Sequence, residues 1–194
     1  MDSPYRPLAP LATVRAASTG TPVRDGVAGV QLVITDRHEK QEIVELIAAS
    51  ALRNPLCIIA GSEWLPSYRV AHSIRRSTVE LERVLNNVRL ARAFTCYQLL
   101  DLLAAAPLDG TPVLVLDFLH TFLPPDLPLP VRLRTLRECC HHLRQLAHHQ
   151  PVTVFALHEP VKDYEIFYPI LAASAGEIVQ PEVEDPASWQ ETLF

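Results

Sequence analysis

The sequence predicts an α/β fold in which a mostly parallel central sheet is covered by helices on both faces. Several short runs, such as LCIIAG (56–61) and VTVFAL (152–157), are apolar throughout, which is typical of strands buried on both faces. These runs alternate with segments of helical periodicity, and such alternation favours a parallel sheet. The chain has 194 residues, 48% of them hydrophobic, which is enough for one domain with its own core.

Each expected element follows from its pattern of apolar residues. Strands are expected at VQLVIT (30–35), LCIIAG (56–61), NVRLARA (87–93), PVLVLDFL (112–119), VTVFAL (152–157) and EIVQPEV (177–183). Helices are expected at 37–53, 67–85, 95–106, 131–149 and 167–175, and a Pro-rich loop at 123–130. Thr95 is a predicted N-cap, because its hydroxyl can accept a hydrogen bond from the first helical turn. In the helix at 131–149 the expected inward residues are Val131, Leu133, Leu136, Cys140, Leu143 and Ala147.

Three segments divide the chain. Residues 1–28 are rich in Pro, Ala, Thr and Gly and are expected to form an N-terminal arm, 29–183 the core domain and 184–194 a polar C-terminal tail. The sequence contains no run of 18 apolar residues, so no membrane span is predicted. The first residues lack the pattern of a secretory signal. The four cysteines form no CxxC pair, which indicates a reducing compartment. We therefore expect a cytoplasmic protein, nucleoid-associated if it is bacterial.

The motifs STG (18–20), NVRLARAFT (87–95), VLVLDF (113–118) and VTVFALH (152–158) occur in collinear order, and over roughly residues 18–180 the sequence resembles the core of the RadA-type recombinases. The apolar strand that ends in Asp117 fits a Walker B strand, whose carboxylate holds the magnesium ion of a bound nucleotide. STG (18–20) is similar to the family's motif before the first core strand, NVRLARAFT (87–95) to its NVxxARAF segment, and VTVFALH (152–158) to the strand before its second DNA-binding loop. The resemblance implies a RecA-like three-layer α/β/α sandwich.

The chain departs from this family where the phosphate-binding Walker A loop, GxxxxGK[ST], belongs. If Lys40 takes the lysine position, Ile34 and Glu39 replace the two glycines and Gln41 replaces the hydroxyl residue. Glycines allow successive N–H groups to turn into one anion-binding concavity, and the hydroxyl ligates magnesium. Both features are missing, and negative charge is added at Asp36, Glu39 and Glu42. We therefore expect the ATP site to be degenerate.

The other positions that the resemblance assigns are also altered. The catalytic carboxylate belongs just after LCIIA, where Ser62 or Glu63 stands, and the family's sensing glutamine is His158 here. The two DNA-binding loops of the family correspond to about 119–130 and 159–168. The first has no basic residue and the second has only Lys162, so we expect weak DNA binding through these loops.

Several residues have a second, plainer interpretation. Asp117 is favoured as a carboxylate that caps a helix or is solvated at a strand end, and Lys40 as a solvated lysine. The net charge of −5 means that DNA binding would need a local basic patch. The candidate residues for it are Arg75, Arg76, Arg89 and Arg92, with Arg83, and they can equally be ordinary surface charges. CCHHLRQLAHH (139–149) has little of the spacing that helical metal ligands need, so no metal is expected.

The combined observations predict a catalytically degenerate RecA/RadA-like paralogue that acts as a binding or scaffolding subunit in DNA recombination or repair. Two alternatives stay open: an active or nucleotide-sensing DNA-dependent ATPase with an atypical phosphate loop, and a KaiC-like regulatory module. No cofactor is expected, except ATP and magnesium under the ATPase alternative. The expected partner is another RecA-like subunit, a second copy or a distinct recombinase, with DNA bound weakly or through that partner. The apolar segment PLAPLATVRAAS (7–18) is the candidate connector.

Overall fold

We analysed a computed structural model of the chain, which describes residues 29–35, 40–62, 65, 67–157 and 162–179. The arm at 1–28 and the tail at 184–194 lie outside the described residues, as does the last part of the strand expected at 177–183. No described helix is long and apolar enough to cross a membrane.

The described strands form one six-stranded sheet in which every pairing is parallel. The strands are β1 (Val30–Thr35), β2 (Leu56–Ala60), β3 (Val88–Arg92), β4 (Val113–Leu116), β5 (Val152–Leu157) and β6 (Glu177–Val179). Their order across the sheet is β3-β2-β4-β5-β1-β6. The parallel sheet is therefore confirmed, and β3 and β6 are its edges in the described part of the chain.

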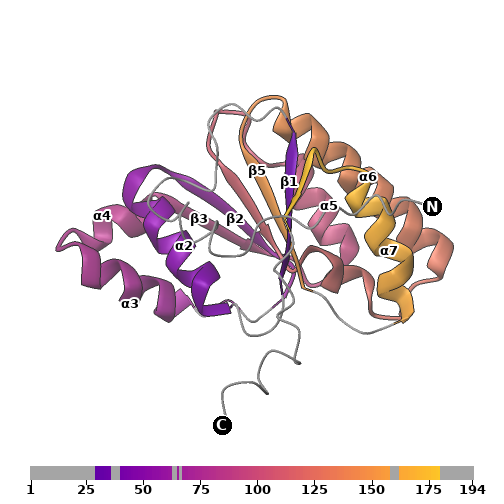
Figure 1. Ribbon diagram of the computed structural model, residues 1–194, viewed down its shortest axis with the longest axis horizontal. Helices are drawn as coiled ribbons and strands as arrows, with labels where there is room; N and C mark the ends of the chain where they lie inside the picture. The colour runs from indigo at the N-terminus through magenta and orange to yellow at the C-terminus, as the bar shows by residue number, and fades with distance from the viewer. Residues whose placement is uncertain (1–28, 36–39, 63–64, 66, 158–161, 180–194) are drawn as a thin grey trace, which may run out of the picture.

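Helices cover both faces of this sheet (Figure 1). On one face lie α2 (Lys40–Arg53), α3 (Ser67–Ser77) and α4 (Leu81–Asn86). On the other lie α5 (Cys96–Ala104), the 3-10 helix η2 (Phe118–Phe122), α6 (Leu129–Ala147) and α7 (Lys162–Ala172). The protein is thus a three-layer α/β/α sandwich of the RecA-like class, as its sequence predicted.

Each face of the sheet has its own hydrophobic core. Ile47, Ile58 and Ile74 belong to the cluster beneath α2, α3 and α4, whereas Val154 and Phe167 belong to the cluster beneath the helices of the opposite face. Strands β2 and β4 are buried at every position. This burial on both faces is the physical reason for their uninterrupted apolar sequences.

Two expected elements end earlier than their patterns suggested. The helix predicted at 67–85 is two helices, α3 and α4, separated where the Glu80 N–H donates to the Thr78 hydroxyl at 3.1 Å. The strand predicted at 112–119 ends at Leu116, because Asp117 adopts a left-handed conformation with φ of 50° and a 3-10 helix follows. This turn gives Asp117 its position at the end of β4.

Candidate functional site at the carboxyl edge of the sheet

The topology brings the predicted nucleotide-site positions to one edge of the sheet. Asp117 follows β4, Lys40 is the first residue of the helix after β1, and β5 separates the two strands. Because neighbouring strands lie about 4.8 Å apart, the ends of β1 and β4 are about 10 Å apart. Parallel α/β sheets bind ligands outside the carboxyl ends of their strands, where the chain passes to opposite faces. The neighbouring strands β2 and β4 meet this condition, because the chain passes from β2 to α3 on one face of the sheet and from β4 to α6 on the other.

The carboxylate of Asp117 is buried and already engaged. Its residue is 6% exposed, and its Oδ2 accepts the hydroxyl hydrogen of Ser62 in a short hydrogen bond. Asp117 is the N-cap residue of η2, but its side chain makes no capping hydrogen bond. Its burial contradicts the interpretation as a solvated carboxylate. Sequence reasoning placed Ser62 only as an alternative to Glu63, and its hydroxyl contacts Asp117.

Gly61 fits closely against the backbone of Asp117. Its N–H donates to the Leu116 carbonyl at 2.8 Å, and a Cβ placed on Gly61 would lie 2.5 Å from the Asp117 carbonyl oxygen. A side chain at position 61 would therefore displace the backbone that presents Asp117. The carboxyl ends of β2 and β4 are joined by backbone and side-chain hydrogen bonds at this point.

The remaining nucleotide-site candidates contribute no phosphate-binding contact within the described residues. Gln41 is exposed on α2, and its Nε2 donates to Glu45 of the same helix at 3.2 Å. Only the backbone of Lys40 is described, at the start of α2. Glu63 and His158 lie outside the described residues. A buried carboxylate with a hydroxyl partner is the chemistry that the described part of this edge offers.

A buried ion pair joins α6 to α7 and contacts the segments that the sequence resemblance had assigned as DNA-binding loops. Arg132 of α6 is buried, and its Nη1 donates to Asp163 Oδ2 at 2.7 Å and to the Phe122 carbonyl at 2.9 Å. Its guanidinium also lies 5.4 Å from the centre of the Phe167 ring. Asp163 belongs to the first turn of α7. The pair thus ties η2 to α7. Sequence reasoning missed it, since it placed Val131 and Leu133 inward.

The structure separates the basic residues proposed as a DNA-binding patch. Arg75 and Arg76 are exposed on α3. Arg92 of β3 donates to the Leu65 carbonyl at 3.0 Å. The Nη1 of Arg89 lies 3.7 Å from Oδ2 of Asp109. Asp109 follows α5, which covers the face of the sheet opposite to α3. Hydrogen bonds from Thr111 hold the pKa of Asp109 below its usual value, so its carboxylate stays charged opposite Arg89. Arg75 and Arg76 therefore do not share a surface with Arg89.

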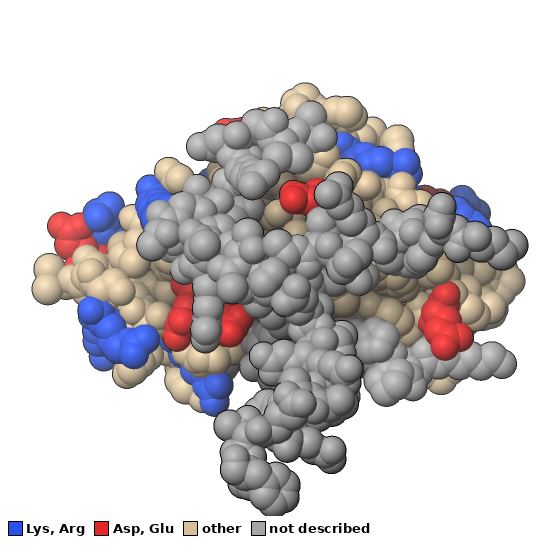
Figure 2. Space-filling view, in the orientation of Figure 1, with Lys and Arg blue, Asp and Glu red and all other residues tan. Residues whose placement is uncertain are grey.

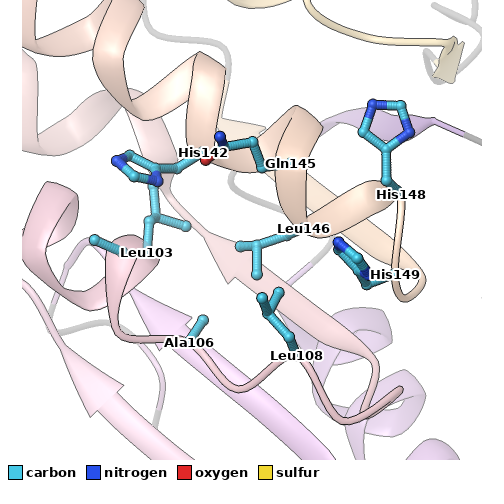
Figure 3. A pocket seen from close by; sticks show the side chains of 9 residues that line it. Leu103, Ala106, Leu108, His142, Gln145, Leu146, His148 and His149 are labelled. Atoms are coloured by element: carbon cyan, nitrogen blue, oxygen red, sulfur yellow. The ribbon is translucent and has the colours of Figure 1, made fainter.

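A second concavity lies at the opposite, amino edge of the sheet, between the C-terminal ends of α5 and α6 (Figure 3). It has a volume of about 280 Å³ and includes Leu103, Leu108, Leu146 and His142 in its lining. Figure 3 shows the leucines converging, whereas His148 is directed away from them. Within the described ranges, no group of three His, Cys, Asp or Glu side chains could hold a metal ion.

The four thiols are not reactive groups of a site. All four cysteines are buried, and burial raises the pKa of the thiols of Cys57, Cys96, Cys139 and Cys140. A thiol must ionise to act as a nucleophile or a metal ligand. These cysteines therefore behave as apolar core residues.

In comparisons with known proteins, the chain matches no family model and no curated protein.

Proposed function

We propose that this protein is a catalytically degenerate RecA/RadA-like paralogue that serves as a binding or scaffolding subunit in DNA recombination or repair. The observation that carries the proposal is the state of Asp117. A Walker B carboxylate helps to hold the magnesium ion of a bound nucleotide, whereas Asp117 is buried and its Oδ2 is engaged by the Ser62 hydroxyl. The turn from Thr35 to Gln41 has no glycine, so it also lacks the residue type that shapes a phosphate-binding loop.

An open sheet edge supports the scaffolding role. In the described part of the chain β3 pairs only with β2. The Ala93 N–H donates to the Ala60 carbonyl, so by alternation Leu90 directs its own N–H and carbonyl away from β2. Leu90 is exposed, and so are Phe94 (60%) and Tyr97 just beyond the strand. An unpaired edge with exposed apolar side chains is a template for an added strand.

The connector that fits this edge is the apolar segment 7–18 of a second copy or of another RecA-like subunit. RadA-type recombinases, which this sequence resembles, assemble head to tail by adding such a segment to the sheet of a neighbour. Leu8, Leu11 and Val14 have no amphipathic helix to join in the sequence. Strand addition would satisfy both the backbone of the segment and the edge of β3.

Deletion of residues 7–18 tests this proposal. Sedimentation velocity of the full chain, alone and with a RadA-type recombinase, should show an assembly that the deletion abolishes while the thermal transition stays in place. Leu90→Asp should weaken the same assembly, because a charge on an edge strand opposes strand addition. Val79→Asp, which introduces the same charge at an exposed apolar residue outside β3, is the control and should have no effect. Unchanged assembly of the deleted chain would exclude the segment as the connector.

A nucleotide-sensing role is the second candidate, and one observation favours it. Lys40 begins the helix after β1 and Asp117 ends β4, so both positions lie on the same edge on either side of β5. This is the placement that a nucleotide bound across the edge would need. Measurement of ATP binding separates the two candidates.

A further inference from the structure

Helix α3 carries a row of aromatic and basic side chains that its neighbours leave uncovered. The row, called here the α3 stripe, consists of Tyr68, Arg69, His72, Arg75 and Arg76, all of them exposed. Tyr68 is 69% exposed, which is unusual for a large ring. Figure 2 shows Lys and Arg side chains at the end of the molecule that carries α3 and α4, with Asp and Glu side chains also present there.

Helical geometry places the five side chains on one face. At about 100° per residue, positions 68, 69, 72, 75 and 76 fall within an arc of about 120° and extend over about 12 Å of the helix axis. The opposite face carries the buried residues Val70, Ser73 and Ile74, which pack toward the sheet. The stripe is therefore fixed on a helix that the core anchors, and it faces solvent along its length.

The arginines of the stripe form no direct ion pair within the described ranges. No described carboxylate forms an ion pair with Arg69, Arg75 or Arg76, although pairs of this kind occur at Arg83 and Arg134. The Arg69 Nε donates to the Tyr68 hydroxyl at 3.2 Å, and its guanidinium lies 6.0 Å from the centre of that ring. An exposed aromatic ring thus shares one helix face with three arginines that form no ion pair with a described carboxylate.

We propose that the α3 stripe binds single-stranded nucleic acid, with its arginines on phosphates and Tyr68 stacked on a base. The guanidinium fork matches phosphate oxygens in a bidentate manner, and a solvent-facing ring accepts any base face. An acidic peptide fits less well, because it would leave the exposed Tyr68 ring without a base to stack on. This surface lies on α3, away from the carboxyl edge and from the loop segments held by Arg132. The inference goes beyond the scaffolding role and does not depend on it.

The expected binding is weak and strongly salt-dependent. Three phosphate contacts predict a slope of about −2.1 in a plot of log K against log salt for a single strand, or about a 20-fold loss of affinity between about 50 and about 200 mM salt. The dissociation constant should fall in the range of about 10⁻⁴ to 10⁻⁶ M that is typical of non-specific binding. Fluorescence anisotropy of a labelled oligothymidylate, titrated with the full chain, measures both quantities.

Paired variants locate the contact. Arg75→Gln/Arg76→Gln should reduce the slope to about −0.7, so that the same salt change costs only about threefold in affinity. The matched control is Arg134→Gln/Arg137→Gln, which removes the same two charges from the exposed side of α6 and should keep the slope of the unmodified protein. Tyr68→Ala should weaken binding about fivefold or more, as expected for loss of a stacked base, whereas Tyr68→Phe should retain it.

Four outcomes would overturn the proposal. These are no binding at about 50 mM salt, equal effects of the α3 and α6 double variants, an unchanged affinity in Tyr68→Ala, and equal competition by an acidic peptide of the same charge. The last two would indicate a surface for anionic protein partners. None of these results depends on self-association, which the deletion of 7–18 tests separately.

Discussion

Replacement of Asp163 by alanine tests the ion pair that it forms with the buried Arg132. The side chain of Arg132 is 8% exposed and the side chain of its partner Asp163 is 34% exposed. Removal of one member of a buried pair costs about 3–5 kcal/mol, because the other charge is left without compensation. The cost here should be nearer 2–3 kcal/mol by the same reasoning, since Asp163 is partly solvated and Arg132 keeps the Phe122 carbonyl.

A double-mutant cycle makes the prediction specific to the pair. For a domain of this size, about 2–3 kcal/mol lowers the melting temperature by about 4–12 °C, and urea unfolding followed by far-UV circular dichroism gives the free energy directly. Arg132→Met removes the buried charge while keeping an apolar stem of similar length. The double variant should therefore lose less stability than the sum of the two single variants, by about 1–3 kcal/mol.

The reasoning would be refuted by a small or additive effect. If Asp163→Ala costs less than about 0.5 kcal/mol, as exposed ion pairs do, the pair does not hold α7 against η2. If the costs of the two single variants simply add, Arg132 and Asp163 act independently. In the expected case, hydrogen exchange should also show faster opening of α7 in Asp163→Ala than in the unmodified chain.

Three further outcomes follow from the described structure. Gly61→Ala should destabilise the protein by about 1–3 kcal/mol in urea unfolding, because its Cβ would meet the Asp117 carbonyl at 2.5 Å. Thr95→Ala should cost about 1 kcal/mol in the same assay, through loss of the 3.2 Å bond from the Gln98 N–H. Burial raises the pKa of the Cys139 and Cys140 thiols, so these thiols should resist alkylation until the chain unfolds. Because the unfolded chain ionises its thiols first, the free energy of unfolding should fall as pH rises above about 8.5, and fast alkylation or a flat pH profile would contradict this.

The sequence predicted the fold correctly where a single local pattern, such as an apolar run or an N-cap residue, defines an element. The buried strands β2 and β4 have no polar residue to alternate with, so their apolar runs indicated a sheet covered on both faces. Thr95 was identified as an N-cap from its place before an apolar-periodic run, and it accepts the expected hydrogen bond. Such signals lie within a few residues of the element that they define.

The candidate site was less readable, because its contacts join residues that are distant in sequence. Ser62 and Asp117 are 55 positions apart, and Arg132 and Asp163 are 31 apart. No local sequence pattern predicts that Arg132, which lies between two apolar residues, is buried against Asp163. The left-handed turn at Asp117, which ends β4 early, also lacks a signal, since glycine is the usual residue there.

The α3 stripe lies between these cases. The sequence indicated Arg75 and Arg76 as candidates for a basic patch. Tyr68, Arg69 and His72 join them on one helix face only when residues 67–77 are known to form a single helix. The spacing i, i+1, i+4, i+7, i+8 is visible in the sequence. What the structure adds is the exposure of these side chains and the burial of the opposite face.

Isothermal titration calorimetry with ATP and magnesium tests the central claim most directly. A turn without glycine and a buried Asp117 that already accepts the Ser62 hydroxyl should leave the protein without measurable affinity up to about 1 mM nucleotide, equivalent to weaker than about −4 kcal/mol. Lys40→Ala and Asp117→Asn should then give the same flat titration. A dissociation constant in the low micromolar range, about −8 kcal/mol, that both variants abolish would contradict a degenerate site and establish a nucleotide-binding protein.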